Sequence, residues 1–465
     1  MAGRRGAAHV QAGADYTMGW IEAIEHNRWL SHQMQALLEQ GRAAWAPTGF
    51  GYFTPDGKLD ETKPVDLAIT ARMTFAYSLG TLMGIPGCRK YGDHGVQCLQ
   101  TYFRDREHGG WFSAIEHEPD EAGRGVPWPD GGEDKWAYAH AFLLLAAATA
   151  TNANRPGAYE LLQDALQNQL DYWYDEDAGA VADRYSRDWA VKEPYRGMNS
   201  LMHTVEAYLA AAEAAQEVEW LERAEKMLAR TYEVASEHNW RVPEHYDENW
   251  RPMLDYNVEA PATPYYPYGY VIGHGMELAR LGAQLRAGLR EEGLPEPDYL
   301  LKSATEMFHR AREDGWRGDG KSGFLFTTDF EGDPVLTERL SWVLCEGICA
   351  AVALRRGMLD DGAADQEVEH FDHAYQTWMD YLHDEMLLEE GVLARTLNED
   401  SEPMEGTIAS RPDIYHPIQA LLVSRLPLWP PMGAALHRGL LDSPRGAPQR
   451  SRPKWGRKRA EGSWR

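Results

Sequence analysis

The sequence predicts an all-α fold in which paired helices form a ring, an α/α toroid. Apolar residues recur at three- and four-residue spacing along most of the chain, the pattern of helices that bury one face. Strand-like runs are short and lie between helices, as at 323–329 and 391–397, and the lack of regular strand–helix alternation disfavours a doubly wound sheet or a (β/α)8 barrel. No low-complexity linker divides the helices, so we expect the ring to close; an open solenoid is the alternative.

About twelve helices are expected between residues 20 and 441. Clear helical periodicity is present, in chain order, at 28–40, 66–83, 136–150, 199–215, 217–235, 270–289, 297–314, 339–356 and 367–388. The loops are rich in Gly, Trp, Tyr and Pro and recur in kind, with Gly-Gly-Trp-Phe at 109–112 and Gly-Phe-Leu-Phe at 323–326. In a toroid of hairpins the loops and helix N-termini converge at the mouth, where we expect a functional site.

The helical region, residues 21–442, is expected to form one catalytic domain, although 465 residues would allow two or three. Residues 443–465 hold six Arg, two Lys and one Glu, a net charge of +7. Because the whole chain has a net charge of −26, the remaining residues carry −33. This segment is rich in Pro and Gly and is predicted to be a disordered basic tail. Residues 1–20 are predicted to be a disordered N-terminal extension.

Charge and composition exclude several classes of function. A net charge of −26 argues against a nucleic-acid binder and against adhesion to anionic lipid. The chain has no apolar run long enough to span a membrane and no secretory signal, and a cytoplasmic location is expected. The four cysteines lack zinc-site spacing and are expected to be buried thiols in a reducing compartment: Cys88, Cys98, Cys345 and Cys349. Because 17 Trp and 23 Tyr suit stacking surfaces, and the charge disfavours bases, a sugar is the expected ligand.

Three motifs that suggest nucleotide or metal chemistry lack the context that this chemistry needs. Residues 315–322 fit the P-loop pattern G-x-x-x-x-G-K-S, but a helix precedes them and a hairpin follows, so a Gly-rich turn is expected. His370 and His373 lie three apart on an amphipathic helix, and 244–247 is a second small cluster; neither has further ligands nearby. H-E-x-x-H and G-x-S-x-G are absent. We therefore expect no metal and no cofactor.

Several polar residues interrupt apolar, helix-opening segments, and these are the candidates for a site: Arg72, Asn199, His203, His274, Glu277 and His416. Asn199 and His203 are four residues apart and share a helix face. The three histidines each lie near the start of a separate apolar helix. In a toroid these helix ends converge, which would bring three imidazoles with a pKa near neutrality into one cavity.

Such a set of side chains suits the transfer of a proton between adjacent carbons of a sugar. This reaction needs a base near neutral pH, a conjugate acid and a donor to the oxygen that becomes charged. Two imidazoles supply the first two, and Arg72 supplies the third. Glycoside hydrolysis, which uses two carboxylates, stays open because the chain has 72 acidic residues.

The same segments carry a family resemblance. The motifs are, in order, PTGFG (47–51), ITARM (69–73), GGW (109–111), YRGMNSLMHTVEA (195–207), RVPEHYD (241–247), GHGMEL (273–278) and DIYH (413–416). With them, the chain from about His26 to Leu441 resembles the N-acylglucosamine 2-epimerase superfamily, and more closely its aldose–ketose isomerase branch of mannose and sulfoquinovose isomerases. The resemblance implies an (α/α)6 barrel and a proton transfer between C1 and C2 through a cis-enediol, without a metal.

The resemblance also implies roles for individual residues. His274 and His416 would be the acid/base pair, with His416 carrying the proton at carbon and His274 assisting ring opening and oxygen protonation. Arg72 would bind the sugar oxygen that becomes charged. Four residues would line the cavity and hold hydroxyls: Asn199, His203, Arg241 and Glu277. Trp342, in RLSWVLCE, would stack on the pyranose.

Two departures from the branch bear on the substrate. Ala68 stands where the branch commonly has Trp, which would enlarge the pocket. Arg395 and Pro412 stand where sulfoquinovose isomerase has glutamines, although Arg395 is itself able to bind an anion. These departures favour interconversion of D-mannose and D-fructose, with D-lyxose and D-xylulose as a further pair. The alternatives are sulfoquinovose isomerisation, 2-epimerisation, glycoside hydrolysis and a non-catalytic sugar-binding module; a monomer or weak homo-oligomer is expected.

Overall fold

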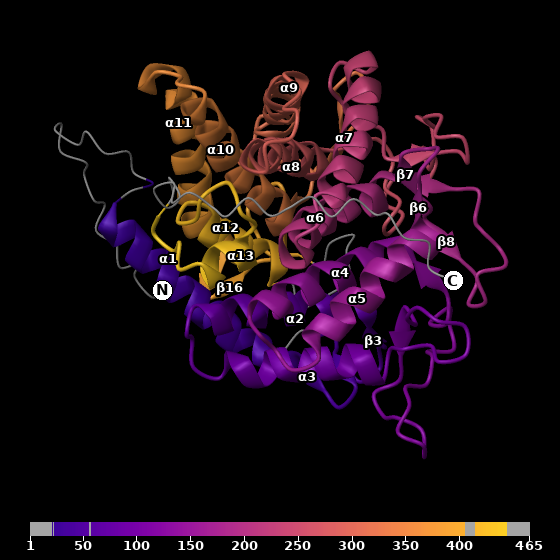
Figure 1. The fold of residues 1–465 in the computed structure, drawn as a ribbon. Coiled ribbons are helices and arrows are strands. Elements are labelled where there is room, and N and C mark those ends of the chain that lie inside the picture. The colour runs from indigo at the N-terminus through magenta and orange to yellow at the C-terminus, as the bar shows by residue number, and fades with distance from the viewer. Residues whose placement is uncertain (1–20, 22, 55–56, 405–413, 444–465) are drawn as a thin grey trace.

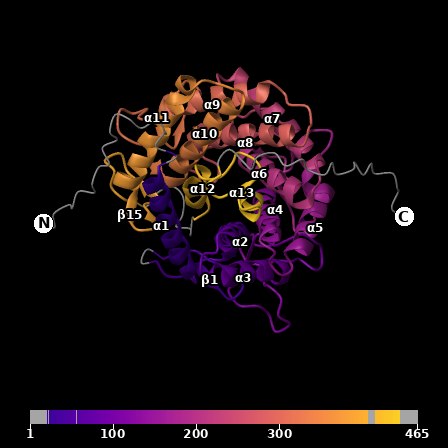
Figure 2. The ribbon, with the colours of Figure 1, turned by 60° about the vertical axis from the view of Figure 1, so that its left-hand side comes forward.

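The computed structural model describes residues 21, 23–54, 57–404 and 414–443, and this part of the chain forms two concentric rings of helices. The inner ring contains α2 (Leu67–Leu82), α4 (Ala137–Asn152), α6 (Met198–Ala215), α8 (Ile272–Glu291), α10 (Ser341–Asp360) and α12 (Tyr415–Val423). The outer ring contains α1 (Ile24–Gln40), α3 (Cys88–Thr101), α5 (Ala158–Asn168), α7 (Glu219–Glu237), α9 (Tyr299–Gly315) and α11 (Asp365–Tyr381). Figure 2 shows the two rings.

The ring closes because the first and last hairpin partners meet. Each inner helix packs against the next inner helix, and α12 packs against both α2 and α1, so the described N-terminal helix completes the sixth hairpin. The short helix α13 (Met432–His437) contacts α2, α4 and α6 (Figure 1). The predicted toroid is therefore confirmed as an (α/α)6 barrel, and the open solenoid is wrong.

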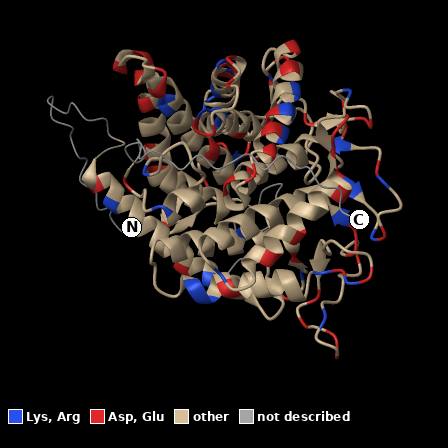
Figure 3. Cartoon of the chain, in the orientation of Figure 1, with Lys and Arg blue, Asp and Glu red and all other residues tan. Residues whose placement is uncertain are grey.

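The two rings differ in sequence because they differ in burial. Inner helices such as α4 and α10 are apolar around most of their circumference and bury nearly every residue. Outer helices such as α7 bury one stripe and expose the other face to water. In Figure 3, acidic residues (red) lie at the upper ends of α7 and α11, with basic residues (blue) interspersed on the outer helices.

Short antiparallel strand pairs tie the inner helices together at one end of the barrel. Five inner helices begin directly after such a strand, and its partner lies in the loop that follows the next outer helix: β3 (Val65–Asp66) with β4 (Ala114–Ile115), β5 (Lys135–Trp136) with β8 (Arg184–Tyr185), β9 (Arg196–Gly197) with β10 (His245–Tyr246), β11 (Tyr270–Val271) with β12 (Thr327–Thr328), and β14 (Arg339–Leu340) with β17 (Thr396–Leu397). The strand-like runs expected at 323–329 and 391–397 contain β12 and β17. These pairs fix where the helix N-termini lie.

The remaining elements are local. Hairpins are formed by β1 (Trp45–Ala46) with β2 (Gly49–Phe50), β6 (Tyr174–Asp175) with β7 (Ala180–Val181), and β15 (Leu387–Glu389) with β16 (Val392–Leu393); β13 (Pro334–Leu336) adds to β12. Short helical turns follow α1, α5 and α11: η2 (Gly41–Ala44), η3 (Gln169–Trp173) and η4 (Leu382–Met386). The four cysteines are buried free thiols, as expected.

In the part of the chain that the structure describes, no helix has the length and apolar character that crossing a bilayer requires. The predicted disordered extension at 1–20 falls outside the described residues, and so does the predicted disordered tail at 443–465 apart from Ser443.

Candidate active site

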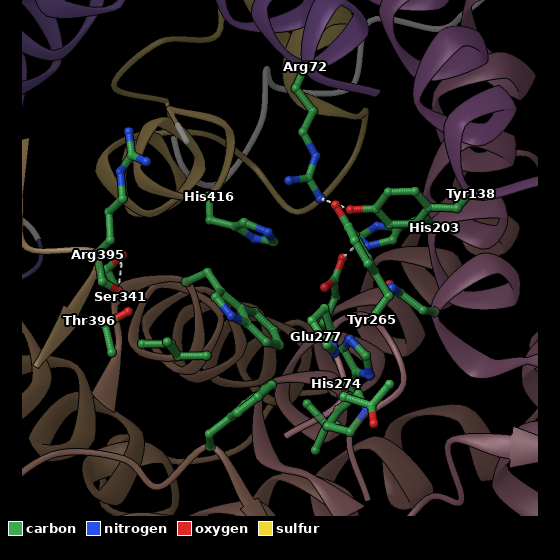
Figure 4. A pocket seen from close by; sticks show the side chains of 18 residues that line it. Arg72, Tyr138, His203, Tyr265, His274, Glu277, Ser341, Arg395, Thr396 and His416 are labelled. Atoms are coloured by element: carbon green, nitrogen blue, oxygen red, sulfur yellow. Dashed lines mark hydrogen bonds and ion pairs between the residues drawn. The ribbon is translucent and has the colours of Figure 1, made fainter. Parts of the chain in front are cut away.

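One cavity of about 180 Å³ lies where the inner helices begin (Figure 4). Eight of the nine residues expected in the site line it: Arg72, Asn199, His203, His274, Glu277, Trp342, Arg395 and His416. They come from segments as far apart in sequence as α2 and α12. The convergence expected of a toroid is therefore present.

The helix starts explain why these side chains meet. His416, Asn199 and Trp342 are each the second residue of an inner helix, and His274 is the third residue of α8. Gly273 precedes His274, and a Cβ atom at this glycine would lie 2.3 Å from the Trp342 ring. Only glycine therefore lets the indole pack against the first turn of α8.

His274 is held by a glutamate that comes from a different hairpin. Its Nδ1 lies 2.7 Å from Oε2 of Glu244, which is buried directly before β10. The backbone of Glu244 accepts a hydrogen bond from the amide of Met198 at 2.9 Å, so the segment is fixed at the start of α6. An ionised carboxylate only accepts, so Nδ1–H donates and Nε2 keeps its lone pair.

His416 has the same arrangement. Its Nδ1 lies 2.8 Å from Oε1 of Glu346, a fully buried residue of α10. Burial raises the pKa of Glu346, but the charge of Arg280 and the hydrogen bond from His416 outweigh it, and the net pKa lies below the ordinary value. Glu346 is therefore ionised and fixes the tautomer of His416 with the Nε2 lone pair available.

Arg72 lies on another wall of the cavity. Its guanidinium donates to the hydroxyl of Tyr138 at 2.8 Å and lies 4.1 Å from the ring centre of Phe142 and 4.9 Å from that of Tyr415. Tyr138 is the second residue of α4 and lines the same cavity. Figure 4 shows both side chains directed to the centre of the site. The guanidinium is therefore placed to stabilise negative charge on a ligand oxygen.

His203 differs from the other two histidines. Its Nδ1 lies 3.4 Å from Oε1 of Glu277 and its side chain is 4% exposed. Burial lowers the pKa of His203 to about 3. The expectation of a near-neutral pKa is therefore wrong for this residue, which stays uncharged and offers hydrogen bonds.

Arg241 lies away from the cavity, contrary to the expectation that it lines it. Its Nε is 2.7 Å from Oδ2 of Asp314, and its Nη1 donates to the carbonyl of Phe330 at 2.9 Å. Both charged side chains are buried. A charge this deep in the protein needs a partner, and Arg241 finds one that holds the loop after β12 to the end of α9. In the motif RVPEHYD, Glu244 is the residue that contacts a side chain of the cavity, that of His274.

The other motifs set aside on sequence grounds lie outside the cavity. Residues 315–322 form a turn at the end of α9, where Lys321 pairs with Asp400 at 2.9 Å. His370 lies on α11, where its ring is 5.3 Å from that of His309.

Two groups of buried residues have donor atoms close enough to share a metal ion: His203, Glu206 and Glu277, and also Glu277, Glu346 and His416. The guanidinium of Arg280 already binds all three glutamates, at 3.0–3.2 Å. A cation would have to displace this fixed charge, so the donor set fits a metal poorly.

Comparison with known proteins gives consistent results. The model of the N-acylglucosamine 2-epimerase (GlcNAc 2-epimerase) family matches residues 49–420. A D-mannose isomerase of Pseudomonas cannabina pv. alisalensis is 38% identical over 419 residues, covering 90% of this chain and 97% of that protein. A D-mannose isomerase of Thermobifida fusca is 37% identical over 424 residues, covering 90% and 98%. A crystal structure of a D-mannose isomerase superposes with a TM-score of 0.75 at 22% identity, covering 88% of this chain and 99% of that one, which shows a shared fold.

Proposed function

The chain belongs to the N-acylglucosamine 2-epimerase family, and from this premise we propose that it is an aldose–ketose isomerase that interconverts D-mannose and D-fructose. Two relatives that share more than a third of its residues over nearly their whole length bear the name D-mannose isomerase. D-Lyxose and D-xylulose are a further substrate pair in this proposal.

The observation that carries the proposal is the pair of histidine–glutamate dyads that face one cavity. His416, oriented by Glu346, takes the proton from C2 of the open-chain aldose, and the electrons of that bond form the C1=C2 double bond of a cis-enediol. His274, oriented by Glu244, accepts the proton of O2 on Nε2 and passes it to O1. His416 then returns its proton to C1, and the carbonyl forms at C2. The charge that develops on oxygen is stabilised by Arg72.

The shape of the cavity suits a single sugar ring. Its volume of about 180 Å³ is below the roughly 300–1,000 Å³ of sites for drug-sized ligands. The ring of Trp342 lies 5.4 Å from that of His274 and 5.5 Å from that of His416, so its indole packs between the two catalytic imidazoles. A pyranose stacked on this indole has its C1 and C2 within reach of both bases.

Glycoside hydrolysis fits the cavity less well. That reaction uses two carboxyl groups on either side of the bond. Among the described residues that line the cavity, Glu277 is the one acidic side chain. Sulfoquinovose isomerisation stays the second candidate because Arg395 lines the same cavity and a guanidinium binds sulfonate oxygens well.

Incubation of D-mannose with the enzyme in deuterated water tests the function. NMR is expected to show fructose with deuterium at C1 as the main product. Glucose with deuterium at C2 as the main product would identify a 2-epimerase, and the absence of any deuterium incorporation or product would refute the proposal. A parallel incubation with sulfoquinovose distinguishes the second candidate, which predicts faster turnover of the sulfonated sugar.

The proposal also includes a monomer or weak homo-oligomer in the cytoplasm, and the four buried free thiols support a reducing compartment. Light scattering after size-exclusion chromatography measures the oligomeric state.

A further inference from the structure

Beneath the cavity, one arginine binds three glutamates from three inner helices. The guanidinium of Arg280 donates to Glu346 from Nε at 3.0 Å, to Glu206 from Nη1 at 3.1 Å and to Glu277 from Nη2 at 3.2 Å. The four side chains are buried, with at most 8% of any of them exposed. We call these four residues the Arg280 cluster.

The charges of the Arg280 cluster do not balance if every group ionises. Three carboxylates and one guanidinium leave a net charge of −2 in a region closed to water, which is costly. Charged and titratable groups face Glu277 from each of the surrounding helices: Arg72 on α2, His203 and Glu206 on α6, Arg280 on α8, Glu346 and Cys349 on α10, and Tyr415 and His416 on α12. Arg72 offsets part of this excess, whereas His203 is uncharged and offsets none of it. Like charges this close favour uptake of a proton by one carboxylate.

Hydrogen bonding identifies the carboxylate that takes the proton. Both oxygens of Glu346 accept, one from Arg280 and one from Nδ1 of His416. Both oxygens of Glu206 accept, one from Arg280 and one from the hydroxyl of Tyr415. Glu277 has a donor at Oε1 only, and its Oε2 is buried without a hydrogen-bond partner in the structure.

The direction of the pKa of each carboxyl group agrees with this assignment. Burial and the charge of Glu346 raise the pKa of Glu277 well above its ordinary value. For Glu206, burial acts in the same sense and is the largest cause, but the charge of Arg280 and the interactions with His203 and Tyr415 together outweigh it, and the net pKa is low. Glu277 also lines the cavity, and Figure 4 shows its carboxyl group directed inward beside His203.

We propose that Glu277 is a neutral carboxylic acid in the resting enzyme and donates a hydrogen bond from Oε2 to a sugar oxygen in the cavity. The second half of this inference rests on the proposed function. With Glu277 neutral, the Arg280 cluster has a net charge of −1. When His416 takes the proton from carbon, its positive charge brings the sum of the cluster and His416 to zero. The cluster therefore stabilises the protonated base, while Glu277 stabilises the enediol oxygen as an uncharged donor.

Infrared spectroscopy tests the protonation state without any turnover. At pH 7 in deuterated buffer, the wild-type protein is expected to show a C=O band of a protonated carboxyl group that is absent from Glu277→Gln. The control Glu213→Gln removes a buried glutamate of α6 that pairs with Arg438, and it is expected to keep the band. A wild-type spectrum without such a band, or a Glu277→Gln difference spectrum that shows lost carboxylate absorption instead, would overturn the inference. Where Glu277→Gln fails to fold, a wild-type spectrum without the band still overturns the inference.

Ligand addition and kinetics test the donated hydrogen bond. Adding fructose is expected to move the carboxyl band to lower frequency, because the O–H group then donates. Glu277→Gln keeps a donor and is expected to lower kcat by up to about tenfold, whereas Glu277→Met loses the donor and is expected to lower kcat by about 10²–10³-fold. Equal losses in the two variants would overturn the donor role. An acid band in a protein that does not isomerise mannose supports the neutral acid and refutes the proposed function, so the two failures are distinguishable.

Discussion

Replacement of Glu346 by glutamine is expected to block the proton transfer at carbon while leaving sugar binding intact. One carboxylate oxygen of Glu346 accepts from Arg280 at 3.0 Å and the other from His416 at 2.8 Å. A glutamine has only one acceptor atom, and Arg280 is only a donor, so the amide oxygen turns to Arg280. The amide nitrogen then donates to Nδ1 of His416, which places the imidazole proton on Nε2. In this tautomer His416 cannot accept a proton from C2.

The size of the effect follows from the loss of a general base. Such a group contributes about 10²–10⁴-fold to the rate, or about 3–5 kcal/mol of transition-state stabilisation. Glu346→Gln is therefore expected to lower kcat by about 10²–10⁴-fold. Because Glu346 does not line the cavity, KM is expected to change little.

The assay follows formation of fructose from mannose and, separately, exchange of the C2 hydrogen with deuterated water. Both rates are expected to fall together in Glu346→Gln. Glu213→Gln is the matched control, because it also removes a buried carboxylate but lies in the last turns of α6. A correctly folded Glu346→Gln enzyme whose kcat stays within about tenfold of wild type would refute the reasoning, since a lost general base costs more than that.

Three further predictions concern other parts of the molecule. Arg72→Met is expected to lower kcat by about 10²–10³-fold, because the charge beside the enediol oxygen is lost. Tyr138→Phe removes one hydrogen bond to that guanidinium and is expected to lower kcat by about 2–10-fold. Similar losses of kcat for the two variants in steady-state assays would contradict this prediction. Arg241→Met is expected to leave kcat/KM unchanged but to lower the free energy of unfolding by up to about 3–5 kcal/mol, because buried Asp314 loses its nearer charged partner and keeps Arg310 at 3.3 Å. Denaturant titration measures this loss, and a selective loss of kcat/KM would contradict a purely structural role for Arg241. Burial raises the pKa of Asp183 from 3.8 to about 6, so the folded state binds the proton of this carboxyl group more tightly than the unfolded state does. The free energy of unfolding therefore falls by about 3 kcal/mol as the pH rises from about 4 to above 6. Asp183→Asn is therefore expected to raise the melting temperature relative to wild type more at pH 8 than at pH 4, and an equal difference at both values would refute the assignment.

Most of the barrel could be predicted from helical periodicity, because five of the inner helices are long and strongly apolar. The inner helix α12, which has nine residues, and the outer helices α3 and α5 are not among the clearly periodic segments. In α3 the reason is visible: Gly92 and Gly95 interrupt the apolar pattern, and a Cβ atom at Gly95 would lie 2.0 Å from Oγ1 of Thr74 on α2. The tight contact between two helices demands a residue that helix propensity disfavours. Packing of this kind has no local signal in one sequence.

The histidines of the site could be predicted from the sequence, but the carboxylates that hold them could not. Histidines near the starts of apolar helices are visible locally, and the toroid brings those starts together. Their carboxylate partners are not visible in this way, because Glu244 is 30 positions from His274 and Glu346 is 70 positions from His416. Both glutamates stand inside the motifs RVPEHYD and RLSWVLCE, in which the expected site residues are Arg241 and Trp342. A charged residue in a motif shows that a partner exists, but only the fold shows which residue it is.

The positions of His274 and His416 also explain why a base at either place needs a glutamate. Both lie in the first turn of an inner helix, where exposed backbone N–H groups and the helix dipole make the surroundings electropositive. An imidazolium formed there during proton transfer is opposed by this field, so a helix start alone makes a poor place for a base. A buried carboxylate at 2.7–2.8 Å on Nδ1 offsets the field and leaves Nε2 facing the cavity. The barrel supplies such carboxylates from neighbouring hairpins, and the same architecture that gathers the histidines therefore makes them usable as bases.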